Sequence, residues 1–270
     1  MADAARIPAV LSIAGSDSGG GAGIQADLKA FARCGVHGMT AITALTAQST
    51  TGVEMVEAVS PEMIVAQVRA VAGDIGVDAV KIGMLGNSET IAAVREALEL
   101  LGDAPVVVDP VMVAESGARL LDEGAHRALI EQILPLAAVA TPNLPEARAL
   151  TQTGEGMSPA ELARAVRDLG PKAIVVTGGH TESGADTFFD GEELEEIDGE
   201  RHPGGAAHGS GCTHSSALAA MLARGAEPLE AARAARRVAS DAVRDGLREI
   251  GAGAGPVDAL NIRAAARRRP

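Results

Sequence analysis

The segment Ala207–Ser216 holds the residue types with the clearest capacity for chemistry in this chain. Its centre reads Gly209-Ser210-Gly211-Cys212, and the Ala/Leu-rich run that follows predicts a helix. A glycine-rich turn at a helix N-terminus leaves backbone N–H groups free at the positive end of the helix dipole, so it can hold an anion. We expect a thiol there to have a lowered pKa and to act as a base or nucleophile. The alternative is a glycine-bearing helix start with a small buried cysteine, and this segment alone leaves both interpretations open.

Acidic and amide side chains stand where apolar runs end. Asp109 ends the run Val106–Val108, and Glu146 opens a predicted helix. Two carboxylates at strand ends could hold Mg²⁺ through water, as phosphate-transfer sites need. Glu146 is explained equally well as an acid of the first helical turn. Gln48 follows another apolar run, and its amide, both donor and acceptor, suits the edge of an amino-substituted heteroaromatic ring, although a solvated glutamine is the alternative.

A glycine-rich loop, Gly15–Gly23, follows the first predicted strand. The pattern Gly21-x-Gly23-x-x-Ala26 satisfies the loose dinucleotide-binding fingerprint, but the loop before it is too long and no acidic residue clearly ends the next strand. A Walker A motif is absent, because Gly-Lys-Ser/Thr does not occur. We therefore expect a flexible backbone loop that closes against a small ligand, with a solvent-exposed glycine turn as the alternative.

Short apolar runs alternate with helical patterns along almost the whole chain. The predicted strands are Ala9–Ala14, Met39–Leu45, Val53–Val59, Ala79–Ile82, Val106–Val108, Ala137–Thr141 and Ala173–Thr177, followed by a hairpin about Asp190-Gly191. The predicted helices are Ile24–Cys34, one from Ser60 to about Gly76, Ser88–Leu101, one capped by Asp122 to about Leu134, Ser158–Leu169, Cys212–Arg224 and Pro228–Arg244. Strands buried on both faces and alternating with helices mean a mainly parallel sheet with helices on both sides.

The residues that could do chemistry gather at one edge of this predicted α/β sheet. Ligands of such folds bind beyond the C-terminal ends of the strands, where the loop Gly15–Gly23, Asp109 and Gly209–Cys212 fall. That clustering is the strongest argument from pattern alone for a site. No break in composition marks a second domain, so residues 1–270 are expected to form one domain, with a core over about 8–262 and a frayed basic C-terminal tail.

Composition limits the kinds of partner. The 270-residue chain has a formal charge of −13, which argues against a general nucleic-acid surface and against anionic membranes. A phosphate site is local and stays compatible with that charge. The two cysteines, Cys34 and Cys212, lie far apart without metal-ligand spacing, so a reduced, cytoplasmic setting is expected. Nothing in Met1–Pro8 resembles a signal peptide, and no uninterrupted run of about 18 apolar residues suggests a membrane span, so neither feature is expected.

Taken together, these segments resemble the ribokinase-like superfamily, and most closely the hydroxymethylpyrimidine/phosphomethylpyrimidine kinases of thiamine biosynthesis. The residues that carry the resemblance are Ala14–Asp17, Gly20–Lys29, Ile42–Gln48, Lys81–Leu85, Asp109–Met112, Thr141–Ala147, Gly178–His180 and His208–Thr213. They occur in family order and cover about residues 8–262. Each motif is ambiguous by itself, whereas the ordered set is highly specific.

The resemblance implies a three-layer αβα ribokinase-like fold and a homodimeric kinase that uses ATP and Mg²⁺. Its substrates would be 4-amino-5-hydroxymethyl-2-methylpyrimidine and then the resulting monophosphate. The implied pyrimidine-binding residues are Gln48 and Asp27, in a pocket lined by Gly15, Thr46 and Met84. The implied anion hole consists of Gly209, Ser210, Gly211 and Cys212, with Cys212 as the base. The implied nucleotide and metal residues are Asn143, Glu146, Thr177 and Gly178, with Asp109 and Glu146 facing Mg²⁺.

Three segments depart from the family pattern. Ser18-Gly19 stands where Pro-Ser is frequent, Ala206-Ala207 replaces a polar pair, and Thr177 stands where many relatives carry lysine before Gly-Gly-His. Without that lysine, charge stabilisation of the transferring phosphate must depend on the helix N-terminus and the metal. The rival functions are a pyridoxal/pyridoxine kinase, a dinucleotide-dependent oxidoreductase built on the loose glycine fingerprint, and a catalytically idle ligand sensor.

Overall fold

The computed structural model describes residues 6–180 and 183–267, and within these residues one nine-stranded mixed sheet forms the centre of the fold. The strand order is β3-β2-β1-β4-β5-β6-β7-β8-β9. The strands are β1 (Ala9–Asp17), β2 (His37–Gln48), β3 (Val53–Ala58), β4 (Ala79–Ile82), β5 (Val106–Val108), β6 (Val139–Ala140), β7 (Ala173–Val176), β8 (Asp186–Phe189) and β9 (Leu194–Ile197). Neighbours from β2 to β7 in this order pair in parallel. The pairs β2–β3, β7–β8 and β8–β9 at the two edges are antiparallel.

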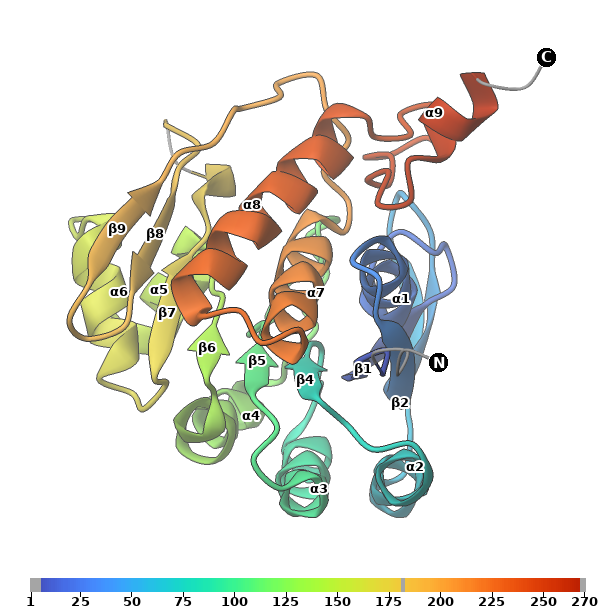
Figure 1. Cartoon of the computed structure of the whole chain (residues 1–270), viewed down its shortest axis with the longest axis vertical. Coiled ribbons are helices and arrows are strands. Elements are labelled where there is room, and N and C mark those ends of the chain that lie inside the picture. The colour runs from blue at the N-terminus through green and yellow to red at the C-terminus, as the bar shows by residue number, and fades with distance from the viewer. Residues whose placement is uncertain (1–5, 181–182, 268–270) are drawn as a thin grey trace, which may run out of the picture.

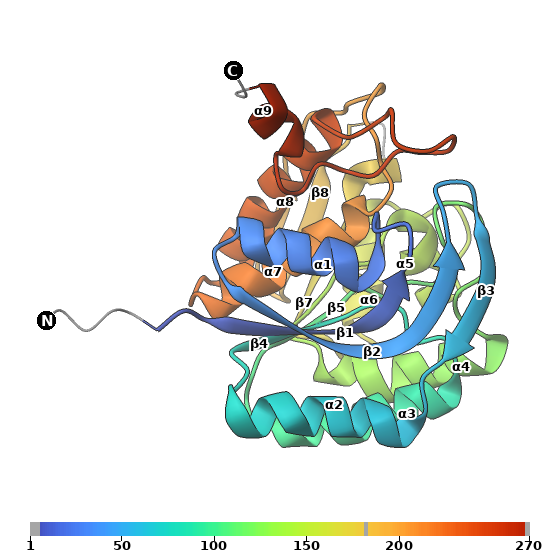
Figure 2. The ribbon, with the colours of Figure 1, turned by 90° about the vertical axis from the view of Figure 1, so that its right-hand side faces the viewer.

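Helices cover both faces of the sheet, as Figures 1 and 2 show. The helices are α1 (Gly23–Arg33), α2 (Pro61–Asp74), α3 (Ser88–Leu98), α4 (Glu123–Ala128), α5 (Leu144–Thr151), α6 (Pro159–Arg167), α7 (Ser210–Ala223), α8 (Pro228–Arg244) and α9 (Ile262–Arg267). One apolar core joins the sheet to α2 through α6, and a second joins its other face to α1, α7 and α8. The expected three-layer αβα fold with a mainly parallel sheet is therefore confirmed.

The central strands are short and apolar because helices bury both of their faces. All side chains of β4 and β5 are buried, and both strands have the bounds that the sequence predicts. Lys81 is the exception to the apolar composition, since it stands in the middle of β4 and is fully buried. It pairs in register with Ser12 of β1, so this lysine lies in the interior of the central sheet.

Capping residues explain where several helices begin. Ser60 accepts a hydrogen bond from the Met63 amide at the start of α2, and Ser158 forms a capping box with Glu161 at the start of α6. The helices α1 and α7 differ, because their N-cap residues, Ala22 and Gly209, supply no side-chain hydrogen bond. No side-chain cap therefore occupies the first backbone N–H groups of these two helices, although the Ser210 amide of α7 donates to the Ala207 carbonyl oxygen at 2.9 Å.

Several predicted bounds are corrected by the structure. The helix expected from Asp122 to Leu134 is α4 followed by a π-helical turn over Leu129–Ile133 and a 3₁₀ turn, and the Asp122 side chain makes no capping bond. The strand expected over Ala137–Thr141 shortens to β6. The C-terminal tail, expected to be frayed, is helical over Ile262–Arg267, where Arg263 pairs with Glu249, while residues 268–270 lie outside the described part.

Candidate active site

A cavity of about 350 Å³ lies at the C-terminal edge of the parallel strands. The predicted site residues that line it are Gly15, Thr46, Gln48, Met84, Asp109, Asn143, Glu146, Thr177, Gly178, Gly209, Ser210, Gly211 and Cys212. They come from the ends of separate strands and from the start of α7, so the fold brings together residues that are distant in sequence.

Asp27 is the predicted site residue that does not line the cavity. Its carboxylate is fully buried beneath the cavity floor and accepts hydrogen bonds from Ser12 (2.6 Å), Ser216 (2.7 Å) and Lys81 (3.0 Å). The expected direct contact between Asp27 and a pyrimidine is therefore corrected, because all of these partners belong to the protein. Its place in the structure is that of a buried anion joining β1, α1, β4 and α7.

Lys81 is the buried cation that sequence reasoning overlooked. Its Nζ lies 3.0 Å and 3.2 Å from the two carboxylate oxygens of Asp27 and 3.9 Å from Asp109 Oδ2, and the side chain also borders the cavity. The signal in the sequence is a lone lysine within an otherwise apolar strand, which is costly to bury unless it is paired. Burial lowers the pKa of Lys81, but the charges of Asp27, Cys212 and Asp109 raise this pKa above its ordinary value. The Lys81 side chain therefore stays charged.

Cys212 borders the cavity in the first turn of α7, as the sequence predicts, but its acidity differs from the expectation. Burial raises the pKa of its thiol to about 12, against the charge of Lys81 and a hydrogen bond from the Gly23 amide, which lower it. The predicted lowering at a helix N-terminus is therefore wrong for the free protein. The main reason is burial of the thiol, and the nearby carboxylates of Asp27 and Asp109 further disfavour the thiolate.

Two acids, Asp109 and Glu146, also line the cavity. Burial, followed by repulsion from Asp109, raises the pKa of Glu146 to about 8. Burial also raises the pKa of Asp109, against the charge of Lys81 and a 3.0 Å hydrogen bond from Ser215. Glu146 also forms a capping box with Asn143 at the start of α5, which confirms it as an acid of the first helical turn, while its role toward Mg²⁺ stays a prediction. A buried carboxylate beside a half-buried one suits a divalent cation, although no cluster of three or more His, Cys, Asp or Glu ligands occurs among the described residues.

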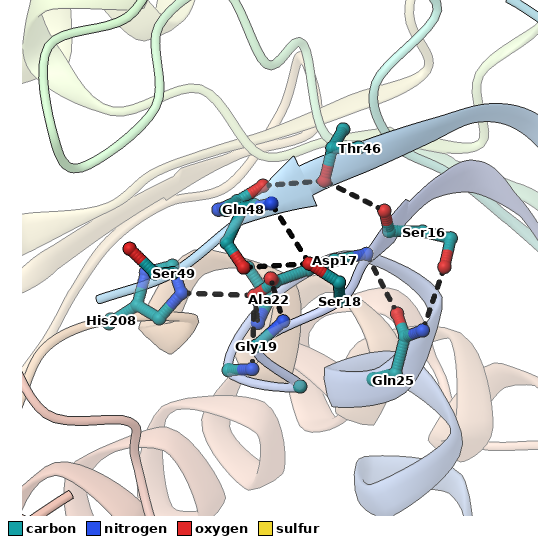
Figure 3. A network of polar contacts seen from close by, with 12 residues as sticks. Ser16, Asp17, Ser18, Gly19, Ala22, Gln25, Thr46, Gln48, Ser49 and His208 are labelled. Carbon is teal, nitrogen blue, oxygen red and sulfur yellow. Dashed lines mark hydrogen bonds and ion pairs between the residues drawn. The ribbon is translucent and has the colours of Figure 1, made fainter. Parts of the chain in front are cut away.

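The two loops that meet at Cys212 are held against each other by Asp17, which sequence reasoning also overlooked. Its carboxylate accepts the amides of Gly19, Gly21 and Ala22, and His208 Nε2 lies 3.1 Å from Oδ2 (Figure 3). Burial raises the pKa of Asp17, but these hydrogen bonds outweigh burial and hold the pKa below its ordinary value. The expected flexible loop Gly15–Gly23 is thus tied to the residue that precedes the Gly209–Cys212 turn.

A third buried pair stands beside the Thr177 and Gly178 end of the cavity. His214 Nε2 lies 3.0 Å from Asp186 Oδ2, while Asp186 accepts the Gly178 amide at 2.7 Å. The Nδ1 atom of His214 has no hydrogen-bond partner in the described part of the chain. Both side chains border the cavity, so they add polar groups near Thr177.

Comparisons with known proteins agree with this geometry. The profile of the family described as phosphomethylpyrimidine kinase matches residues 17–258. The hydroxymethylpyrimidine/phosphomethylpyrimidine kinase of Rhizobium meliloti is 51% identical over 253 residues, covering 92% of this chain and 95% of that protein. The solved phosphomethylpyrimidine kinase of Clostridium difficile is 38% identical with a TM-score of 0.77, covering 88% of this chain and 100% of that chain. The Staphylococcus aureus pyridoxal kinase in complex with AMP-PCP is 33% identical with a TM-score of 0.86, covering 95% of each chain.

Proposed function

The chain belongs to the phosphomethylpyrimidine kinase family, and from that membership we propose that it catalyses two successive phosphoryl transfers from ATP. The first acceptor is the hydroxymethyl group of 4-amino-5-hydroxymethyl-2-methylpyrimidine, and the second acceptor is the resulting monophosphate. The chain is a phosphotransferase of thiamine biosynthesis. The observation that carries the residue assignments is that Cys212 borders the same cavity as Gln48 and the acids Asp109 and Glu146.

The rival functions are less well supported. Pyridoxal kinases share the fold at 33% to 37% identity, but the family profile and the 51% identical relative are both named for the pyrimidine. The dinucleotide fingerprint has a structural explanation, because the Gly21 and Ala22 amides bond to Asp17 rather than facing outward for a ligand. An idle ligand sensor is distinguished from the kinase by turnover alone.

The ring-binding end of the cavity is formed by Gly15, Thr46, Gln48 and Met84. Gln48 offers the ring a donor and an acceptor, and Met84 offers a polarisable apolar surface. The substrate hydroxymethyl group would then point from the ring toward the turn Gly209–Cys212, with its hydroxyl group facing Cys212. Within that turn the Ser210 amide donates to the Ala207 carbonyl oxygen at 2.9 Å, so the Gly211 and Cys212 amides would be the donors for the transferring phosphoryl oxygens. Preformed donors of this kind lower the barrier to phosphoryl transfer.

Lys81 supplies a fixed positive charge in the cavity beside Cys212. Its pairing with Asp27 keeps it charged and stationary, and Asp109 lies 3.9 Å from its ammonium group. This charge stands in a different element from the lysine that many relatives carry at the Thr177 position. We assign part of the missing charge stabilisation to it.

Asp109 and Glu146 would hold Mg²⁺, and Asn143, Thr177 and Gly178 would border the nucleotide. Bound Mg²⁺ would neutralise phosphate charge as the phosphoryl group transfers. The two acids fit that ion because burial raises the pKa of both carboxyl groups and Asp109 raises that of Glu146 further, so a bound cation would offset the cost of their charges. The S. aureus pyridoxal kinase was solved in complex with AMP-PCP, an analogue of ATP, which supports ATP as the phosphoryl donor here.

Cys212 would receive the proton of the substrate hydroxyl group. With a raised pKa the thiolate is scarce at neutral pH but strongly basic, and in a loose transition state the proton leaves late. The rate of transfer is therefore expected to rise with pH over the neutral and mildly alkaline range.

The proposed function is tested by coupled ATP-consumption assays with the hydroxymethylpyrimidine, its monophosphate and pyridoxal. We expect the pyrimidine to give the higher kcat/KM, Cys212→Ala to lose at least about 100-fold in kcat, and Cys34→Ala to keep wild-type turnover because Cys34 is buried in the core away from the cavity. Gln48→Ala should raise the KM for the pyrimidine more than the KM for ATP. Full turnover by Cys212→Ala would remove the base assignment, and a higher kcat/KM for pyridoxal would favour the rival kinase.

The proposal also includes a homodimer and a cytoplasmic location. Exposed apolar side chains on β2 and the edge strand β3, namely Leu45, Met55 and Val56, support a self-contact, and Cys34 and Cys212 are both free thiols. No helix in the described ranges is long and apolar enough to cross a membrane. Light scattering on the purified protein measures the oligomeric state.

A further inference from the structure

The hydroxyl group of Thr46 lies between two oxygen atoms at the ring-binding end of the cavity. Thr46 Oγ1 is 2.9 Å from the Ser16 carbonyl oxygen and 3.1 Å from Gln48 Oε1, and Figure 3 shows the three residues side by side. Both distances are hydrogen-bond distances. A threonine hydroxyl group has one hydrogen, however, and can donate to one of these oxygens at a time.

The single hydrogen decides which way the Gln48 amide faces. If Thr46 donates to Ser16, then Oε1 of Gln48 would face the hydroxyl oxygen with no hydrogen between them. Turning the amide by half a turn places Nε2 at that position, so that Gln48 donates to Thr46 and Thr46 donates to Ser16. Both contacts then hold a hydrogen, and amide orientations are assigned by this kind of bookkeeping of donors and acceptors.

The backbone at Gln48 is held independently of Thr46. The Ser18 hydroxyl group accepts the Gln48 N–H at 2.9 Å and donates to the Gln48 carbonyl oxygen at 2.7 Å. Ser16 is held in turn by Gln25, whose Nε2 donates to the Ser16 hydroxyl oxygen at 2.8 Å. Thr46 therefore acts on the orientation of the amide and not on the path of the main chain.

We propose that Thr46 is a specificity-determining positioning residue, which turns Oε1 of Gln48 toward the cavity and so selects a ring that carries an amino group. This inference rests on the proposed function, since it concerns the same ring pocket. In this orientation Gln48 keeps an acceptor and one N–H for the ligand. An exocyclic amino group beside a ring nitrogen supplies the matching donor and acceptor, as adenine does for a glutamine side chain.

A ring with an oxo group in place of the amino group presents the reverse pattern. Its carbonyl group accepts, and the neighbouring ring N–H donates. To match it, the Gln48 amide would have to turn back and lose one hydrogen bond of the chain that runs through Thr46 to Ser16. The net value of one such bond corresponds to about a 10-fold change in affinity.

The first test uses the wild-type protein and titration calorimetry without ATP. The ligands are 4-amino-5-hydroxymethyl-2-methylpyrimidine and the analogue with a 4-oxo group. We expect the amino ligand to bind at least about 10-fold more tightly. Equal affinities would overturn the proposal without any variant.

The second test compares Thr46→Val, which keeps the shape but lacks the hydroxyl group, with Thr46→Ser, which keeps the hydroxyl group. Thr46→Val should reduce the amino-to-oxo affinity ratio about 10-fold, because Gln48 can then turn freely, whereas Thr46→Ser should retain the wild-type ratio. A role limited to packing would lower both affinities together and leave the ratio unchanged, which would overturn the proposal. Absence of binding and turnover of the amino ligand by the wild type would instead contradict the proposed function.

Discussion

Lys81 and Asp27 form an ion pair in which both side chains are fully buried, with 3.0 Å between Nζ and Oδ1. The pair joins β4 to α1 directly under the cavity, and Ser12 and Ser216 complete the hydrogen bonds of the carboxylate. A buried pair of this kind adds little stability relative to apolar residues, but losing one partner leaves an uncompensated charge. It therefore ties the floor of the active site to the integrity of the fold.

Removing the positive charge of this pair should be strongly destabilising. Lys81→Met is expected to lower the free energy of unfolding by about 3–5 kcal/mol, because Asp27 is left charged and buried. Adding Asp27→Asn should recover part of that loss. Urea denaturation measures both, with Lys172→Met, a change at an exposed lysine, as the matched control. Equal losses for the two lysine variants would contradict the buried-pair argument.

The contact between Gly209 and Gly21 gives a second prediction. Gly209 has φ of +84°, and an added Cβ would overlap the carbonyl oxygen of Gly21. Gly225 has φ of +85° with no atom within 4 Å of an added Cβ, so it shows the backbone strain alone. Gly209→Ala should cost about 2 kcal/mol more than Gly225→Ala in the free energy of unfolding. Equal costs would mean that the two loops separate without penalty.

The raised pKa of Cys212 predicts the pH dependence of its alkylation. In a Cys34→Ala background, the rate with iodoacetamide should rise about tenfold per pH unit from pH 7 to 10, because the thiolate is the reactive form. A plateau near neutral pH would show instead the lowered pKa that the helix N-terminus alone would produce. Lys81→Met should slow the reaction further, since the ammonium group favours the thiolate.

Glu146 predicts how stability varies with pH. The folded protein keeps a proton on Glu146 up to pH of about 8, whereas the unfolded chain releases it near pH 4.5, so the free energy of unfolding falls as pH rises between these values. Glu146→Gln removes this term and should recover on the order of 2 kcal/mol at pH 8. Denaturation between pH 5 and 8 measures the slope. Glu62→Gln, a change at an exposed helical acid, should keep the wild-type slope; an unchanged slope in Glu146→Gln would refute the assignment.

Mg²⁺ should stabilise the wild type through the same acids. At ten times its Kd the ion is expected to raise the free energy of unfolding by about 1.4 kcal/mol. Glu146→Gln should lose most of that gain, while NaCl at matched ionic strength gives the background. Equal stabilisation of both proteins by MgCl₂ would place the ion elsewhere.

The local features of the chain were predictable from sequence. The bounds of β4, β5 and α8 agree with those expected, because apolar periodicity and Pro at the first turn of a helix act over a few residues. Parallel strands place their C-terminal ends at one edge, so the sequence also indicated that Gln48, Asp109 and Cys212 would share a site. The π-helical turn after α4 had no such local signal.

The sequence by itself thus determined the alternation of strands and helices, the glycine-rich turn at the start of α7 and the ordered motifs of the family. Only the tertiary structure decided what Asp27, Lys81 and Cys212 do. Asp27 bonds to Lys81 and Ser216 across 54 and 189 residues of sequence, and these distances close only when the layers pack. The pKa of Cys212 depends on burial and on those neighbouring charges, which no local pattern encodes.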